Sequence, residues 1–182
     1  MQYRILLVDD EPHILEALRR TLNALTKNEL QGHTLEVEAF VSPAAALQRA
    51  DYIPFDLVIT DYRMPEMTGV EFLVKLKTIQ PNTMRLILSG HADLDGLIGA
   101  INLAEIFRFI AKPWHEYELH AAVVQALSYR YLSMENQRLA DLTRVQQGRL
   151  SRQELELRRL EEENPGITKV NWGPDGAVIL EP

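Results

Sequence analysis

Residues that could act together in phosphate or metal chemistry stand at the ends of four apolar runs in this sequence. In chain order they are Asp9 and Asp10, Asp61, Ser89 and Lys112. Three carboxylates gathered at one place repel one another, and a hard divalent cation compensates them. Mg²⁺ fits best because it prefers carboxylates together with water and phosphate oxygens. Zinc is disfavoured, since the chain has no cysteine and its five histidines are scattered.

The elements that must position these residues alternate along the chain. Five apolar runs, each followed by a segment of helical period, predict a doubly wound α/β fold, a parallel sheet with helices on both faces. The predicted strands are Tyr3–Val8, Leu35–Val41, Leu57–Thr60, Arg85–Leu88 and Phe107–Ala111. With the strand order 2-1-3-4-5, the ligand crevice lies between the first and third strands and brings Asp9, Asp10 and Asp61 together.

Local signals mark where helices begin. Ser42 is a predicted N-cap followed by Pro43 at the first helical position, and Thr68 with Glu71 forms a predicted capping box. Further helices are predicted from Pro12 to about Leu25, from Asp93 to about Leu103, and from about Tyr117 onward.

The last predicted helix is longer than a compact domain needs. Between Tyr117 and Glu163 there is no proline and one glycine, Gly148, which predicts one continuous helix. One heptad register gives a seam of Tyr129, Leu132, Asn136, Leu139, Thr143, Gln146, Leu150, Gln153, Leu157 and Leu160. We expect a coiled coil with a partner helix, and a solitary solvated helix or a flexible linker is the alternative.

A third segment follows the long helix. Asn164, Pro165 and Gly166 end the helix, and two short strands, Thr168–Trp172 and Ala177–Leu180, are predicted around a Gly-Pro-Asp-Gly turn. The chain therefore divides into a domain of residues 1–128, a coiled-coil or long-helix extension of residues 129–163, and a terminal hairpin or tail of residues 164–182.

Composition disfavours several classes of protein. Without cysteine there is no disulfide framework or cysteine nucleophile, and the N-terminus has no signal peptide or membrane span, so we expect a cytoplasmic protein with no membrane partner. Residues 1–120 hold 11 Lys and Arg against 17 Asp and Glu, and residues 121–182 hold 8 against 9. Neither part has the basic surplus that binding to a phosphate backbone uses, so direct nucleic-acid binding is not expected.

Four segments together resemble the receiver domain of two-component response regulators, in the order and spacing of that family over residues 1 to about 128. They are Leu6-Leu7-Val8-Asp9-Asp10-Glu11, Thr60-Asp61-Tyr62-Arg63-Met64-Pro65 followed by Gly69, Leu88-Ser89-Gly90, and Phe109-Ile110-Ala111-Lys112-Pro113. The resemblance implies a flavodoxin-like fold with an extended C-terminal helix and a short terminal β-hairpin.

The resemblance also implies roles for the acidic residues. Asp61 resembles the phosphoacceptor, which attacks the phosphohistidine of a sensor kinase and becomes an aspartyl phosphate. Asp9 and Asp10 resemble the acidic pair that binds Mg²⁺, with Asp61 and the backbone carbonyl of Arg63 as further ligands. Such a protein is a phosphoacceptor rather than an enzyme, and we expect it to phosphorylate itself from small phosphodonors with Mg²⁺ and to dephosphorylate itself.

Three further positions match the family pattern. Lys112 resembles the lysine that pairs with the phosphoryl group, and Ser89 the hydroxyl that hydrogen-bonds it. Phe109 stands at the position of the switch aromatic, whose inward rotamer goes with the phosphorylated state. The bond between Lys112 and Pro113 matches the site of a cis peptide.

The resemblance implies a response regulator in a phosphorelay. Its expected partners are a sensor histidine kinase or phosphotransfer protein, a second copy bound through the C-terminal helix or the receiver face, and a downstream protein. The alternative is the N-terminal receiver fragment of a larger cyclic-di-GMP phosphodiesterase or cyclase, because Phe107–Trp114 and the long helix resemble regulators with such domains. A haloacid-dehalogenase-type phosphatase is disfavoured, since Arg63 stands where that class needs a second aspartate.

Overall fold

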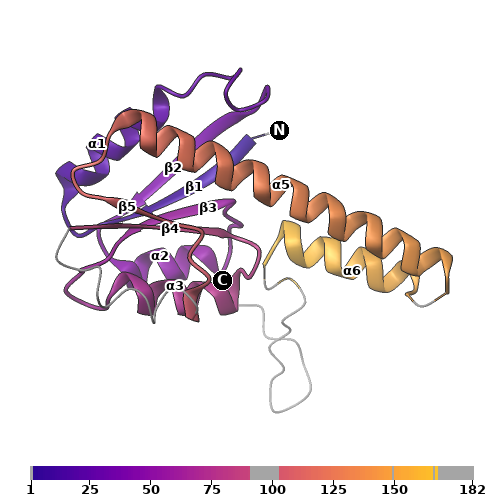
Figure 1. Ribbon diagram of the computed structural model, residues 1–182. Helices are drawn as coiled ribbons and strands as arrows, with labels where there is room; N and C mark the ends of the chain where they lie inside the picture. The colour runs from indigo at the N-terminus through magenta and orange to yellow at the C-terminus, as the bar shows by residue number, and fades with distance from the viewer. Residues whose placement is uncertain (1, 91–102, 149, 166, 168–182) are drawn as a thin grey trace, which may run out of the picture.

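A five-stranded parallel sheet forms the centre of the protein. The computed structural model describes residues 2–90, 103–148, 150–165 and 167. The strands are β1 (Gln2–Val8), β2 (Thr34–Phe40), β3 (Leu57–Asp61), β4 (Met84–Ser89) and β5 (Arg108–Ala111). They pair in parallel in the order β2-β1-β3-β4-β5 (Figure 1). The predicted doubly wound fold and strand order are confirmed.

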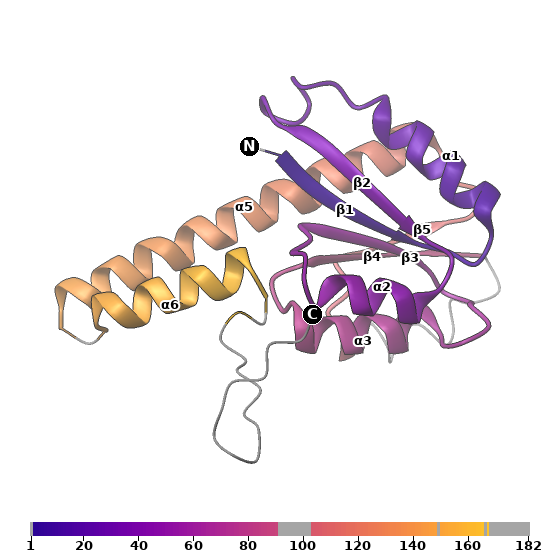
Figure 2. The ribbon, with the colours of Figure 1, turned by 180° about the vertical axis from the view of Figure 1, so that it is seen from behind.

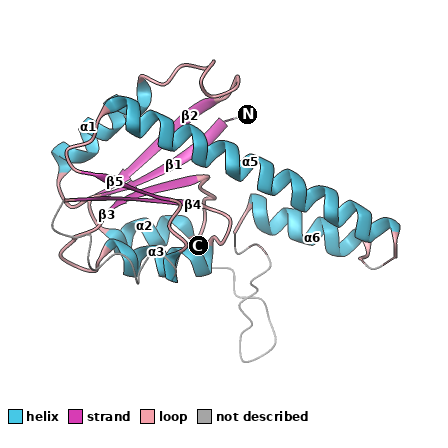
Figure 3. Ribbon diagram, in the orientation of Figure 1, coloured by secondary structure: helices cyan, strands magenta, loops and turns pink. Residues whose placement is uncertain are grey.

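Helices cover both faces of the sheet. The described helices are α1 (Pro12–Asn23), α2 (Pro43–Ala50), α3 (Gly69–Ile79), α5 (Glu116–Gln146) and α6 (Arg152–Glu163). Helices α1 and α5 lie on one face, and α2 and α3 lie on the other (Figure 3). Each face has its own core, around Leu18 and Val123 on the first and around Phe72 and Leu73 on the second. Strand β3 is buried along its whole length, because both faces are covered.

Three of the predicted helix starts, those of α1, α2 and α3, are confirmed. The Ser42 hydroxyl accepts a hydrogen bond from the Ala45 amide at the start of α2, and Pro12 opens α1. Thr68 and Glu71 form both hydrogen bonds of a capping box at the start of α3. The start of α3 matters most for function, since it follows the loop that leaves the end of β3.

The single continuous helix predicted between Tyr117 and Glu163 is wrong. The chain turns after α5, and α6 returns antiparallel alongside it (Figure 2). Gly148 in the turn has φ of +67°, a left-handed conformation that favours glycine after a helix. Ser151 and Glu154 then form a capping box that starts α6. The extension is therefore an α5–α6 hairpin.

An ion pair holds α5 against the amino-terminal edge of the sheet. The Arg130 Nη2 atom of α5 lies 3.3 Å from Oδ1 of Asp56, which directly precedes β3. The other oxygen of Asp56 accepts a hydrogen bond of 2.8 Å from the Arg4 amide in β1. Helix α5 therefore runs across the sheet, from the loop after β5 at the carboxyl-terminal edge to Asp56 at the amino-terminal edge.

Some predicted elements lie outside the described residues. These are the terminal strands Thr168–Trp172 and Ala177–Leu180, and the helix from Asp93 to about Leu103 except for its last residue. Among the described helices, none combines the length and apolar character that crossing a bilayer requires.

Candidate functional site

Two buried carboxylates meet one ammonium group at the carboxyl-terminal edge of the sheet. Lys112 follows β5, and its Nζ atom lies 2.7 Å from Oδ2 of Asp9 and 2.5 Å from Oδ1 of Asp61. Asp9 follows β1 and Asp61 ends β3, and these strands are neighbours in the sheet. Asp9 is 1% exposed and Asp61 is 7% exposed. The parallel topology thus brings together residues that are 103 positions apart in the sequence.

Backbone amides hold the second oxygen of each carboxylate. Oδ1 of Asp9 accepts a hydrogen bond of 2.9 Å from the Glu11 amide, and Oδ2 of Asp61 accepts one of 2.7 Å from the Arg63 amide. Each carboxylate therefore contacts a loop amide with one oxygen and Lys112 with the other. Two such contacts fix the orientation of both side chains before any ligand arrives.

Burial and charge oppose each other in this cluster. Burial raises the pKa of Asp9, and hydrogen bonds from Lys112 and Glu11 only partly offset it. Burial alone would lower the pKa of Lys112, but its hydrogen bonds to Asp61 and Asp9 outweigh this effect and raise that pKa. Lys112 therefore stays an ammonium at neutral pH, while Asp9 remains a poorly compensated buried acid that favours a further cation nearby.

Ser89 and Lys112 are linked by a backbone hydrogen bond at the carboxyl-terminal edge of the sheet. Ser89 is buried at the end of β4, where its carbonyl accepts a hydrogen bond of 2.7 Å from the Lys112 amide. Its hydroxyl donates a hydrogen bond of 3.2 Å to the carbonyl of Gly90. The peptide bond between Lys112 and Pro113 is cis, as predicted.

Known proteins share this fold and sequence pattern. The profile of the response regulator receiver domain matches residues 5–124. The chain belongs to the response regulator receiver family. Among curated relatives, the hydrogenase transcriptional regulatory protein HoxA of Cupriavidus necator is 35% identical over 138 residues, which are 76% of this chain and 27% of HoxA. The response regulator protein TmoT of Ectopseudomonas mendocina is 31% identical over 72% of this chain and 56% of TmoT.

Solved structures also place the chain among receiver domains. The crystal structure of adenylate cyclase from Rhodopirellula baltica superposes with a TM-score of 0.68 at 32% identity, over 78% of this chain and 98% of that one. The signal receiver domain of an HD domain-containing protein from Pseudomonas fluorescens Pf-5 superposes with a TM-score of 0.62 at 35% identity, over 72% of this chain and 98% of that one. The chain spans only about a quarter of the length of HoxA. It is the receiver domain of a two-component response regulator with a helical extension.

The predicted magnesium ligands are only partly gathered in this receiver. Asp9 and Asp61 face Lys112, whereas Asp10 is half-exposed at the start of the following loop. In the described part of the chain, no three acidic, histidine or cysteine side chains form a ready set of metal ligands. The donors at this edge are nevertheless carboxylate and carbonyl oxygens, the kind that Mg²⁺ prefers. The residues fit that ion by chemistry, and the ligand set stays a prediction.

Phe109 is a residue of β5 that packs into the core between the sheet and helices α2 and α3. It is half-buried on β5 beside Ile87 of β4, and it packs against the cluster that contains Phe72. The structure gives one position of this ring, so its role as a switch stays a prediction.

Gly69 has a structural role at the site that the sequence did not predict. A Cβ atom placed on Gly69 would lie 2.0 Å from the carbonyl oxygen of Asp61 and 3.2 Å from Cγ2 of Thr60. The Gly69 amide donates a hydrogen bond of 2.8 Å to the Tyr62 carbonyl, which keeps the loop closed on the end of β3. The backbone that carries Asp61 can hold this position only beside a glycine.

We expect Gly69→Ala to destabilise the receiver by about 3 kcal/mol or more, since backbone must move to make room. Chemical denaturation monitored by circular dichroism measures this loss. Gly32→Ala is the matched control, because a Cβ at Gly32 meets nothing within 4 Å although its φ is +88°. It should cost only about 1 kcal/mol. Equal losses in the two variants would show that the close approach to Asp61 is unimportant.

Proposed function

We propose that Asp61 accepts a phosphoryl group from the phosphohistidine of a sensor kinase or phosphotransfer protein, and that the helical extension transmits the change. The bridge from Lys112 to both Asp9 and Asp61 supports this most strongly. A fixed ammonium beside a buried carboxylate is what an incoming phosphoryl group requires, because negative charge accumulates on its oxygens.

The transfer exchanges one bond to phosphorus for another. A carboxylate oxygen of Asp61 forms the new P–O bond, the P–N bond to the donor histidine breaks, and the imidazole leaves with the electron pair and takes up a proton. Lys112 faces Oδ1 of Asp61 and balances the charge on the phosphoryl oxygens. The buried Ser89 hydroxyl at the end of β4 donates a hydrogen bond to the product.

Asp9, Asp10, Asp61 and the carbonyl of Arg63 are the groups that would hold Mg²⁺. When bound, this ion neutralises phosphoryl oxygens and helps to keep the attacking and leaving atoms in line. The protein's own contribution is the orientation of the carboxylates by the Glu11 and Arg63 amides. We also expect self-phosphorylation from small donors, because such a donor needs only a phosphoryl group with a leaving group.

Incubation with phosphoramidate and Mg²⁺ tests the proposal. We expect one acid-labile phosphoryl group per chain, measured by intact-protein mass spectrometry, and spontaneous loss after the donor is removed. Addition of EDTA should stop uptake. Failure to take up a phosphoryl group, or uptake of an acid-stable one, would contradict a phosphoacceptor role.

The phosphorylated receiver acts either on a partner protein or on a further domain of the same polypeptide. The curated relatives named above are regulators, whereas one solved neighbour is the receiver of an HD domain-containing protein. Under the second alternative, the chain would be the receiver of a larger cyclic-di-GMP phosphodiesterase or cyclase, which the resemblance of Phe107–Trp114 and the long helix suggested. The mass of the native protein in its source cells separates the two, and fractionation of those cells tests the predicted cytoplasmic location.

A further inference from the structure

Charged and polar residues lie between α5 and α6. Asp141 of α5 is 4% exposed, and its Oδ1 atom accepts hydrogen bonds of 2.7 Å from Arg144 and 3.3 Å from Arg158 of α6. One turn away, the Gln137 side chain donates a weak hydrogen bond of 3.4 Å to Glu162. The side chains of Arg144 and Arg158 are more than half exposed, so solvent screens their attraction to Asp141 and each ion pair contributes little. The hairpin is therefore weakly held by these contacts.

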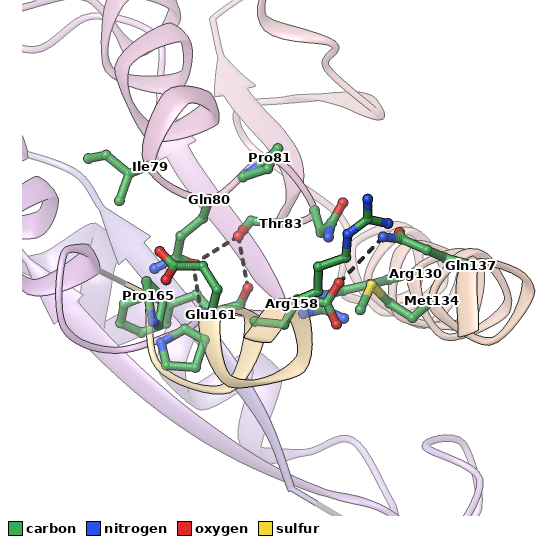
Figure 4. A pocket seen from close by; sticks show the side chains of 14 residues that line it. Ile79, Gln80, Pro81, Thr83, Arg130, Met134, Gln137, Arg158, Glu161 and Pro165 are labelled. Carbon is green, nitrogen blue, oxygen red and sulfur yellow. Dashed lines mark hydrogen bonds between the residues drawn. The ribbon is translucent and has the colours of Figure 1, made fainter. Parts of the chain in front are cut away.

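Packing around α6 is incomplete. An open pocket of about 300 Å³ lies where the end of α6 approaches the sheet, lined by residues that include Pro81, Met134 and Pro165 (Figure 4). Among the described residues, Arg130 has a buried Nε atom without a hydrogen-bond partner. The unsatisfied polar atom disfavours the closed hairpin, and the open pocket shows that α6 leaves part of this surface uncovered.

Leucines of the hairpin point outward instead. Leu132 and Leu139 of α5 are 60% and 50% exposed, and Leu157 and Leu160 of α6 are 55% and 37% exposed. Asp141 is thus buried in the hairpin while these four leucines are exposed, the reverse of the usual arrangement in water.

The spacing of these leucines fits a different state of the chain. At about 100° per residue, Leu132 and Leu139 lie on the side of α5 away from Gln137 and Asp141, which meet α6. The α6 leucines likewise lie away from α5, so the hairpin separates the two pairs. In one continuous helix, all four fall in the same 4-3 register and share one seam.

We propose that the hairpin opens at Gly148 into a continuous helix whose leucine seam pairs with the same seam of a second copy of this chain. Asn136 argues for a second copy, because an asparagine within a seam is satisfied by the identical asparagine across the interface. This inference rests on the proposed output through the helical extension. It does not depend on phosphoryl transfer, and its test uses no phosphodonor.

Gly148→Ala tests the opening. A Cβ on Gly148 meets nothing within 4 Å, so the substitution acts through its φ of +67°. This strain should favour the open chain about fivefold, and the association constant of a dimer of two open chains about 25-fold. Sedimentation velocity of the full chain measures dimer formation, and circular dichroism should show added helix. Gly32→Ala, with φ of +88°, is the matched control and should associate like the original protein. Equal association of the two variants would overturn the proposal.

Two further variants test the seam and the closed state. Leu132→Glu with Leu139→Glu, added to Gly148→Ala, should abolish the dimer without unfolding the protein, because both leucines are exposed. Since the chain has no cysteine, Gln137→Cys with Glu162→Cys allows one bismaleimide to link α5 to α6 within a chain. The linked protein should stay monomeric. A dimer that survives the glutamates, or that forms from linked hairpins, would overturn the proposal.

Discussion

Phosphoryl uptake is expected to fall by about 1,000-fold or more in Asp61→Asn, because an amide cannot replace the attacking carboxylate. The variant should keep its fold, since asparagine has nearly the same shape and can still accept the hydrogen bond from the Arg63 amide. Uptake from phosphoramidate with Mg²⁺, followed by intact mass, gives the comparison.

Asp56→Asn is the matched control for this substitution. Asp56 stands at the other end of β3, pairs with Arg130 and accepts a hydrogen bond from the Arg4 amide. The two substitutions remove one carboxylate charge at opposite ends of β3, but only that of Asp61 faces Lys112. The Asp56 variant should take up the phosphoryl group at the original rate. Retained uptake in Asp61→Asn would place the acceptor elsewhere.

Lys112→Met is expected to slow phosphoryl uptake by about 100- to 1,000-fold. Methionine keeps much of the length of the side chain but removes the ammonium that lies 2.5 Å from Oδ1 of Asp61. A preorganised charge at the position where negative charge develops commonly contributes a factor of this size. The initial rate of uptake from phosphoramidate, compared with that of the original protein, measures the effect.

Lys77→Met is its control. Lys77 of α3 forms an ion pair of 2.7 Å with the exposed Glu105, away from the site. The same change of side chain there should leave the rate unaltered. If both lysine variants kept the original rate, the charge of Lys112 would have no part in the reaction.

Much of the sheet and its site could be predicted because the signals are local or topological. Apolar runs gave the strands, caps such as Thr68 with Glu71 gave the helix starts, and the order of a doubly wound sheet brought Asp9 and Asp61 together. The helix predicted through Gly148 failed for a local reason. The sequence from Ser151 to Glu154 has the same capping-box pattern as Thr68 to Glu71, and it marks a new helix start.

Other features depend on contacts that no local pattern contains. The pairing of Arg130 with Asp56 joins α5 to the far end of β3. The requirement for glycine at position 69 comes from its approach to the Asp61 carbonyl. The sequence also predicted three carboxylates around a cation, whereas in the structure the Lys112 ammonium contacts two of them. Each of these features depends on residues that only the tertiary structure brings together.

The site and the hairpin are joined through α5. Lys112 lies shortly before its first turn, and Asp141 lies near its last turns, where it binds α6. A shift of the loop after β5 on phosphorylation would therefore act directly on the helix that carries the hairpin. Such coupling needs two populated arrangements of one element, and the closed hairpin and the open helix provide them in our proposal.

The most direct test of phosphorylation at Asp61 is chemical mapping of the modified residue. Borohydride reduces an aspartyl phosphate to homoserine, which peptide mass spectrometry can locate after treatment with phosphoramidate and Mg²⁺. We predict homoserine at position 61 and at no other aspartate. Homoserine at Asp9, Asp10 or any other position, with Asp61 unmodified, would contradict the account.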